Sequence, residues 1–340
     1  MRYETRLPLH NGKAPRWLYS LMKELGEKIF SIMLDEFGED ELLRKITNPN
    51  WLQALACALG YDWHSSGTTT VTMAVIKECL NETREIYVAG GKGRAGIKTP
   101  EDIEKGTELL GISFERDKLV ELSRIAAKVD SHLVYDNTNI YHHNFIFTRH
   151  KWGVVQQAMQ GNYAIRFQWF SDFLRKDLTE EPHAGVYAEI NKSTMDLTYE
   201  KNREIKELSV DIVKGSEVIE YPSRHWIDVK SDLGGRGIEA LKRAHELDPK
   251  DYKDLLLVKG MGRKALKALA LIASLMYGKE LAYRNPVAFS YSFGGKDGVP
   301  FPVQRETYAQ VIEDLRLLID EANMEREKKL TVLKNLGEKI

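Results

Sequence analysis

The sequence has no long apolar run and no excess of positive charge. No stretch of about 18 consecutive apolar residues occurs, so we predict no membrane-spanning helix and no membrane partner. Residues 1–6 are too polar for a secretory signal peptide. Lys and Arg number 49 against 50 Asp and Glu, which gives a formal net charge of −1. This balance excludes nucleic-acid binding by bulk basicity, and any such binding needs a local patch.

Cysteine and glutamine are both scarce. Two cysteines, Cys57 and Cys79, cannot form a disulfide framework or a zinc ribbon, so we predict buried thiols in a cytoplasmic protein. Only 7 glutamines accompany the 50 acidic residues, and a chain rich in Glu and Lys but poor in amides is typical of a thermophilic source. Hydrophobic residues make up 43% and charged residues 29% of the chain, which is typical of a globular protein.

The spacing of apolar residues predicts an α+β protein, mainly helical, with a small β-sheet in the middle and a C-terminal helix-hairpin-helix module. Apolar residues recur at helical spacing through the first 80 residues, and the last third is helical again. The strands are expected at 85–89, 140–147 and 152–157, with the last two joined as a hairpin.

Three regions follow from this pattern. Residues 1–215 are predicted to form the mainly helical, catalytic domain with the small sheet, and residues 216–302 the helical module. Residues 303–340 are predicted to form a long charged helix that packs back on the protein or mediates homo-oligomer formation.

The clearest motif is Gly260-Met261-Gly262, which separates two short apolar helices. It resembles the helix-hairpin-helix of DNA repair and recombination proteins, and the resemblance implies a grip on the nucleic-acid backbone without sequence readout. The glycines permit the tight turn and leave N–H groups open to a phosphate. Met261 is expected to anchor the turn in the core. The predicted nucleic-acid-binding residues are Lys259, Gly260, Gly262, Arg263, Lys264 and Lys267.

The same hairpin permits two alternatives. Lys264 stands where the DNA glycosylases of lyase type that share this motif carry a nucleophilic lysine. These enzymes also need an aspartate shortly downstream, and here the next one is the more distant Asp297. A DNA glycosylase/AP lyase therefore stays an alternative, beside a non-catalytic DNA-binding protein.

A glycine-rich loop follows the first predicted strand. Residues 91–96 match the pattern G-x-G-x-x-G, but a helix capped by Thr99 begins only later, and no second strand follows as a dinucleotide-binding fold requires. No Gly-Lys-Ser/Thr occurs, which excludes a P-loop. Because flexible backbone lies among cations, we predict a phosphate-binding loop. Its residues are Lys92, Gly93, Arg94 and Lys98.

Histidines and acids gather in the middle of the chain. Strand alternation places Tyr141 with His143 on one face, and we expect this face to be the core and His142 to lie on an accessible polar face. Gln156 and Gln157 should also face opposite ways. The composition suits acid–base chemistry or a divalent metal ion, although no HExxH spacing occurs. The candidate catalytic residues are His64, Asp130, Asp136, His142 and His183.

Several longer strings are specific enough to compare with protein families. They lie at 60–67, 89–93, 98–100, 127–130, 141–143, 154–157, 181–183 and 294–303. In these strings the chain resembles an uncharacterised prokaryotic family, common in archaea, that is known as a domain of unknown function. Ala158 departs from the glycine expected there. The resemblance implies no activity.

These residues together predict a nucleic-acid-processing enzyme, most simply a DNA phosphodiesterase or nuclease. The hairpin would hold the backbone, while the histidines and aspartates would activate water, directly or through a divalent metal ion.

Overall fold

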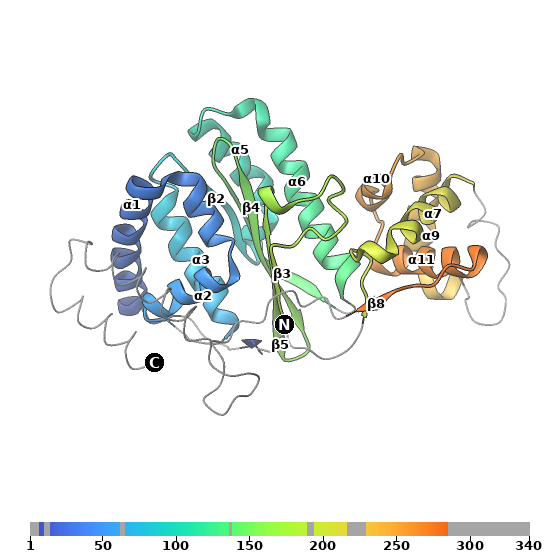
Figure 1. Cartoon of the computed structure of the whole chain (residues 1–340), viewed down its shortest axis with the longest axis horizontal. Helices are drawn as coiled ribbons and strands as arrows, with labels where there is room; N and C mark the ends of the chain where they lie inside the picture. Colours follow the sequence, from blue (N-terminus) through green and yellow to red (C-terminus); the bar gives the residue numbers. More distant parts are fainter. Residues whose placement is uncertain are drawn as a thin grey trace.

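The computed structural model describes residues 7–9, 14–61, 65–135, 138–188, 194–215 and 229–284. One antiparallel sheet lies at its centre and helices cover both faces (Figure 1). The strands are β1 (Leu7–Pro8), β2 (Tyr87–Lys92), β3 (Asn139–Phe147), β4 (Trp152–Gln160), β5 (Tyr163–Phe170) and β6 (Gly185–Tyr187). Their order is β1-β5-β4-β3-β2, and β6 also pairs with β5. The architecture is α+β and mainly helical, which confirms the predicted class.

Three helices cover one face of the sheet: α1 (Arg16–Ile46), α2 (Pro49–Ala58) and α3 (Ser66–Leu80). Gly38, at φ 78° and ψ 170°, interrupts α1 with a kink. Asn48 caps α2 by accepting from two backbone N–H groups, and Ser65 caps α3 in a capping box. The N-termini of α2 and α3 are therefore firmly placed against the sheet.

The opposite face carries α4 (Arg94–Ile97), α5 (Thr99–Leu109), the 3-10 turn η1 (Ser113–Glu115), α6 (Arg116–Val129) and the π-helix η2 (Asp130–Val134). Beyond α6 lies a group of helices: α7 (Arg203–Lys214), α9 (Val229–Leu247), α10 (Tyr252–Leu257) and α11 (Arg263–Tyr277). Two 3-10 turns, η3 (Ser171–Phe173) and η4 (Glu200–Asn202), and a small ladder of β7 (Thr194–Met195) with β8 (Tyr283–Arg284) complete the described part.

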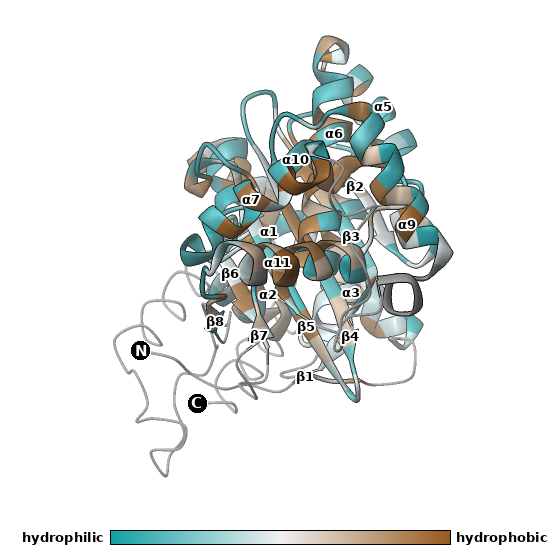
Figure 2. Ribbon diagram, turned by 90° about the vertical axis from the view of Figure 1, so that its right-hand side faces the viewer, coloured by the Kyte–Doolittle hydropathy of each residue, from teal (hydrophilic) through white to brown (hydrophobic). Residues whose placement is uncertain are grey.

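The helices α7, α9, α10 and α11 pack against one another through their apolar faces. α11 lies between its neighbours with hydrophobic residues along its length (Figure 2). Since α7 packs into this group, the group begins at Arg203, upstream of residue 216. The predicted helix at 303–340 lies outside the described residues. Among the described helices, none combines the length and apolar character needed to cross a bilayer.

The β3–β4 hairpin confirms the predicted strand pair, and its register explains which side chains share a face. From His142 onward the residues alternate as expected. A bulge between Ile140 and His142 shifts the earlier part of β3. The hydroxyl of Tyr141 therefore reaches Gln157 at 2.5 Å, on the side of His142, and its predicted placement with His143 is wrong.

Candidate functional site

A network of buried polar side chains centres on Asp130, the first residue of η2. Asp130 is 0% exposed, and its two carboxylate oxygens accept from three side chains. His183 Nε2 lies 2.5 Å from Oδ1, Trp169 Nε1 donates to Oδ2 at 3.0 Å, and the amide of Gln156 also donates to Oδ2. The predicted candidates Asp130 and His183 are thus brought into direct contact. A π-helix is rare and frequently marks a functional site.

The hydrogen bonds of Asp130 define the tautomer of His183. A carboxylate can only accept, so Nε2 of His183 carries the proton and Nδ1 of the neutral ring has a free lone pair. Nδ1 makes no hydrogen bond with the residues that the structure describes. The ring lies between Phe167 and Trp169, each with its centroid 5.5 Å away. This geometry is that of a base oriented by a fixed carboxylate.

The network continues from Gln156 to α6. Its amide N–H₂ donates to Ala126 and Asp130, so its oxygen must accept, and Nδ1–H of His143 donates to it over 2.8 Å. Burial lowers the pKa of His143, and the neutral ring therefore accepts at Nε2 from Ser123 over 2.9 Å. His143 is a satisfied core histidine, as the sequence predicted.

The expectation that His142 lies on an accessible face is wrong. Its side chain is 2% exposed because α2 and α3 cover that face of the sheet. Its pKa is lowered to about 3, mainly by burial and to a smaller extent by His143 and Lys92, while an interaction with Asn144 acts in the opposite direction. Neither ring nitrogen has a hydrogen-bond partner among the described residues. His142 is therefore separated from Asp130 and His183 by the sheet itself.

The glutamine pair faces opposite ways, as predicted. Gln156 belongs to the Asp130 network, whereas Gln157 accepts from Thr69 at 2.6 Å and donates to the carbonyl of Ser66 at 2.9 Å. Beside Gln157, on β5, lies the guanidinium of Arg166, which is 0% exposed. The middle of the sheet is thus polar on both faces.

The glycine loop begins on β2, directly beside the two histidines: Lys92 pairs with His142 in the ladder. Lys92, Arg94 and Lys98 are exposed and Gly93 has φ 61°, so the cations stand on an open turn. Thr99 does not cap the helix as expected, because it is the first residue of α5 and its hydroxyl donates to Gly96. The antiparallel pairing of β2 with β3 confirms that this loop belongs to no dinucleotide-binding fold.

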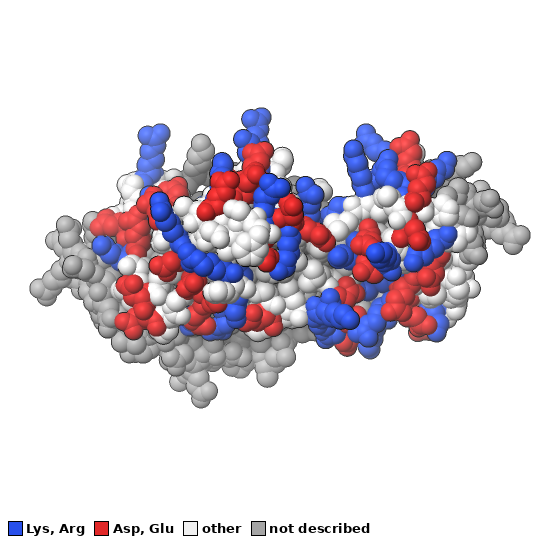
Figure 3. All heavy atoms as spheres, turned by 90° about the horizontal axis from the view of Figure 1, so that it is seen from above, with Lys and Arg blue, Asp and Glu red and all other residues white. Residues whose placement is uncertain are grey.

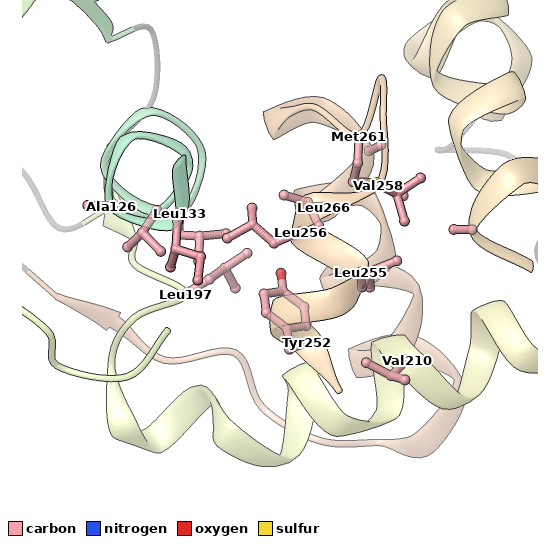
Figure 4. Packing of buried hydrophobic residues seen from close by; sticks show 14 of the residues in the cluster. Ala126, Leu133, Leu197, Val210, Tyr252, Leu255, Leu256, Val258, Met261 and Leu266 are labelled. Carbon is pink, nitrogen blue, oxygen red and sulfur yellow. The ribbon is translucent and has the colours of Figure 1, made fainter. Parts of the chain in front are cut away.

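The α10–α11 hairpin (residues 252–277) is anchored in the core. Met261 is 2% exposed, as predicted, and the apolar side chains of α10 and α11 meet those around η2 (Figure 4). Arg263 donates to the carbonyls of Ser131 and Thr138. It therefore connects α11 to η2 and has a structural role, and its predicted contact with nucleic acid stays a prediction.

The exposed part of the hairpin is its tip. Lys259, Gly260 and Lys264 are exposed, and Gly260 adopts φ 89°, a conformation that favours glycine. Gly262 is the N-cap of α11 and offers no capping side chain. The N–H groups of the first turn thus have no capping side chain, and the exposed Lys259 and Lys264 lie in the same turn region. The surface seen from above carries both charge signs intermixed, so the positive charge at the tip is local (Figure 3).

A family model described as a protein of unknown function (DUF763) matches residues 4–303. The chain belongs to this family. A search of the curated proteins and a search of the solved structures each found no match. Membership in the DUF763 family confirms that the chain belongs to an uncharacterised domain family, and the description of the family assigns no activity.

In this DUF763 chain, the described residues do not fit a divalent metal ion. No three His, Cys, Asp or Glu side chains among them lie close enough together to hold one, and both oxygens of Asp130 already accept hydrogen bonds. His64 and Asp136 lie outside the described residues. No step is therefore assigned to a metal.

Sequence reasoning missed three members of the polar layers, namely Ser123, Arg166 and Trp169. Arg166 and Trp169 lie on β5, which was not predicted, although residues 163–170 alternate after a Gly-Asn turn. That alternation is the signal that would have found them. Ser123 carries no such signal, because a serine on a helix is usually solvent-facing.

Proposed function

We propose that this protein binds the phosphate backbone of nucleic acid, DNA foremost, through the α10–α11 hairpin, and that it hydrolyses phosphodiester bonds next to Asp130 and His183. The observation that carries the proposal is the attachment of the hairpin to η2. Arg263, the first residue of α11, donates to Ser131, the residue that follows Asp130 in the chain. A phosphate held at the start of α11 would thus lie next to η2, the element that carries Asp130.

The hairpin tip has the chemistry that a backbone phosphate needs. Free N–H groups at a helix N-terminus bind phosphate, and the dipole of the 15-residue α11 favours a negative charge there. Lys259 and Lys264 make no ion pair with the described residues, so their charges are available. Such contacts read no base, which fits a protein that acts on the backbone.

The Asp130–His183 pair supplies a mechanism for hydrolysis. Nδ1 of His183 would take a proton from water as the water oxygen bonds to phosphorus, and Asp130 would stabilise the imidazolium that forms. The P–O bond to the leaving oxygen would break, and the imidazolium would return its proton to that oxygen. Trp169 and Gln156 hold the carboxylate in place. The exposed cations of the glycine loop, Lys92 and Arg94, would contact a neighbouring phosphate.

Replacing Lys259 and Lys264 together with Gln should weaken DNA binding without unfolding the protein, because both side chains are exposed. Each lost phosphate contact lowers the slope of log affinity against log salt by about 0.9, so the double variant should lose about 1.8. Fluorescence anisotropy with a short duplex at several salt concentrations measures this slope.

The matched control is Lys105→Gln with Lys118→Gln. These two lysines are exposed on α5 and α6, and their loss leaves the net charge equal to that of the hairpin variant. The control should keep the wild-type slope. Equal slopes in the hairpin variant and the wild type would refute the assignment of the hairpin.

The lyase alternative relies on Lys264 as a nucleophile, and nothing in its surroundings favours it. The side chain is exposed on the first turn of α11 rather than enclosed beside an acid. Borohydride trapping on abasic DNA would yield a covalent adduct only under that alternative. Binding without turnover would instead favour the non-catalytic DNA-binding protein.

A further inference from the structure

Among the described residues, the layer between the sheet and α2–α3 contains no carboxylate near its buried cation. β3, β4 and β5 contain no Asp or Glu, and neither does α2. The acid of α3 is Glu78, near its C-terminal end, where it accepts from Tyr19. The chain has 50 acidic residues, yet no described one lies near Arg166, so no negative charge there would repel a bound anion.

Arg166 lies in this layer without a counter-ion. Its side chain is 0% exposed, and burial lowers its pKa to about 10, so it stays charged at neutral pH. Its hydrogen bonds are long: Gln53 at 3.4 Å, Thr69 at 3.3 Å and the carbonyl of Pro49 at 3.5 Å. Nε has no partner among the described residues, while the guanidinium stacks 4.8 Å from the ring centroid of Tyr187.

A buried charge without a partner is strongly unfavourable, because it loses its hydration and gains no opposite charge. Buried guanidinium groups are therefore normally paired with a carboxylate or a phosphate. The three neutral acceptors around Arg166 lie near the outer limit of hydrogen-bond length, so an anionic oxygen would replace weak contacts with stronger ones. Among the described residues, Arg166 thus has no anionic partner.

His142 is the second unsatisfied group on this face. It lies in the same cross-strand row as Arg166, with Gln157 between them, so their Cα atoms are two strand spacings, about 10 Å, apart. Both of its ring nitrogens lack partners among the described residues although the side chain is 2% exposed. A neutral imidazole can donate one hydrogen bond and accept another, so it matches an uncharged polar group rather than a second anion.

We propose that a phosphate monoester binds between the sheet and the N-termini of α2 and α3, with its phosphate on Arg166 and its uncharged polar part toward His142. A phosphate can pair with the fork of donors on Arg166 in a bidentate geometry and still has further oxygens to place at the N-termini of the helices. The N-terminus of α3, where Gln157 reaches the carbonyl of Ser66, adds its positive dipole. The ligand class is a nucleotide-type monoester, either free or at the end of a strand.

The site does not depend on the hairpin, so the two proposals fail separately. In a thermal melt, a mononucleotide 5′-phosphate at about 100 times its Kd should raise the Tm of the wild type by several degrees, and the matching nucleoside should not. Arg166→Met should remove this shift and should be no less stable than the wild type without ligand. The hairpin variant Lys264→Gln should keep the shift.

A second variant tests whether the uncharged polar part of the monoester lies at His142. His142→Leu should keep the Tm shift with inorganic phosphate and lose most of the additional shift that the mononucleotide gives. This variant decides the question even if Arg166→Met does not fold. Equal mononucleotide shifts in His142→Leu and the wild type would overturn the proposal, and so would a wild type that no phosphate stabilises or an undiminished shift in Arg166→Met.

Two oligonucleotides separate the sources of the phosphate. A 5′-phosphorylated single strand that stabilises the wild type more than its unphosphorylated twin assigns the site to strand ends. A shift with the mononucleotide alone assigns it to free nucleotides. Either result supports the site.

Discussion

Asp130→Asn should reduce phosphodiester turnover by roughly 10²–10⁴-fold while the protein stays folded. Asn has nearly the same shape as Asp, but an NH₂ group replaces one of the two carboxylate oxygens. Trp169 and Gln156 can only donate to position 130, so the amide oxygen must face them and the NH₂ must face His183. Nε2 of His183 would then accept, and the proton would move to Nδ1. The lone pair that serves as the base is lost, although the ring keeps its place.

Measuring both turnover and Tm for each variant separates this effect from unfolding. Trp169→Phe is the matched control, because it removes one donor to Asp130 and leaves the tautomer of His183 unchanged. It should retain far more turnover than Asp130→Asn. Wild-type turnover in a folded Asp130→Asn variant would exclude His183 as the base.

Gly90→Ala should destabilise the protein by roughly 3–5 kcal/mol, since it combines overpacking with backbone strain. Gly90 has φ 83°, and a Cβ there would overlap the carbonyl oxygen of His143 and the hydroxyl of Thr99. Its N–H donates to Asp102 at 3.0 Å and its carbonyl accepts from Lys77 at 2.8 Å, so the backbone cannot move away.

The control for this change lies three residues away in the same loop. Gly93 has φ 61°, but a Cβ there would meet nothing within 4 Å. Gly93→Ala should therefore cost only the strain of a backbone conformation that favours glycine (φ 61°, ψ −120°), roughly 1–3 kcal/mol. Thermal or denaturant unfolding of the two variants measures the difference, and similar losses for both would contradict the close packing at Gly90.

Local patterns predicted much of the fold. Apolar spacing gave the helices on one side of the sheet, and alternation gave the β3–β4 hairpin with Gln156 and Gln157 on opposite faces. The bulge at Ile140 left no trace in the sequence, because it depends on the pairing of β3 with β4. For the same reason the face of Tyr141 could not be derived from alternation.

The sequence predicted which residues belong to the candidate site but not how the fold arranges them. Asp130 and His183 are 53 positions apart, and only the fold brings them to 2.5 Å. Which face of β3 water can reach depends on α2 and α3, which lie far from it in the chain. The structural role of Arg263 depends likewise on Ser131 and Thr138, more than 120 positions upstream.

The structure of the full chain bound to a short DNA duplex tests the central claim most directly. The account predicts a backbone phosphate within about 2.7–3.2 Å of the N–H groups of Lys264 or Ala265 at the start of α11. It also predicts the side chains of Lys259 and Lys264 alongside the same strand. A duplex bound elsewhere on the surface, with the tip of the hairpin free of phosphate, would contradict it.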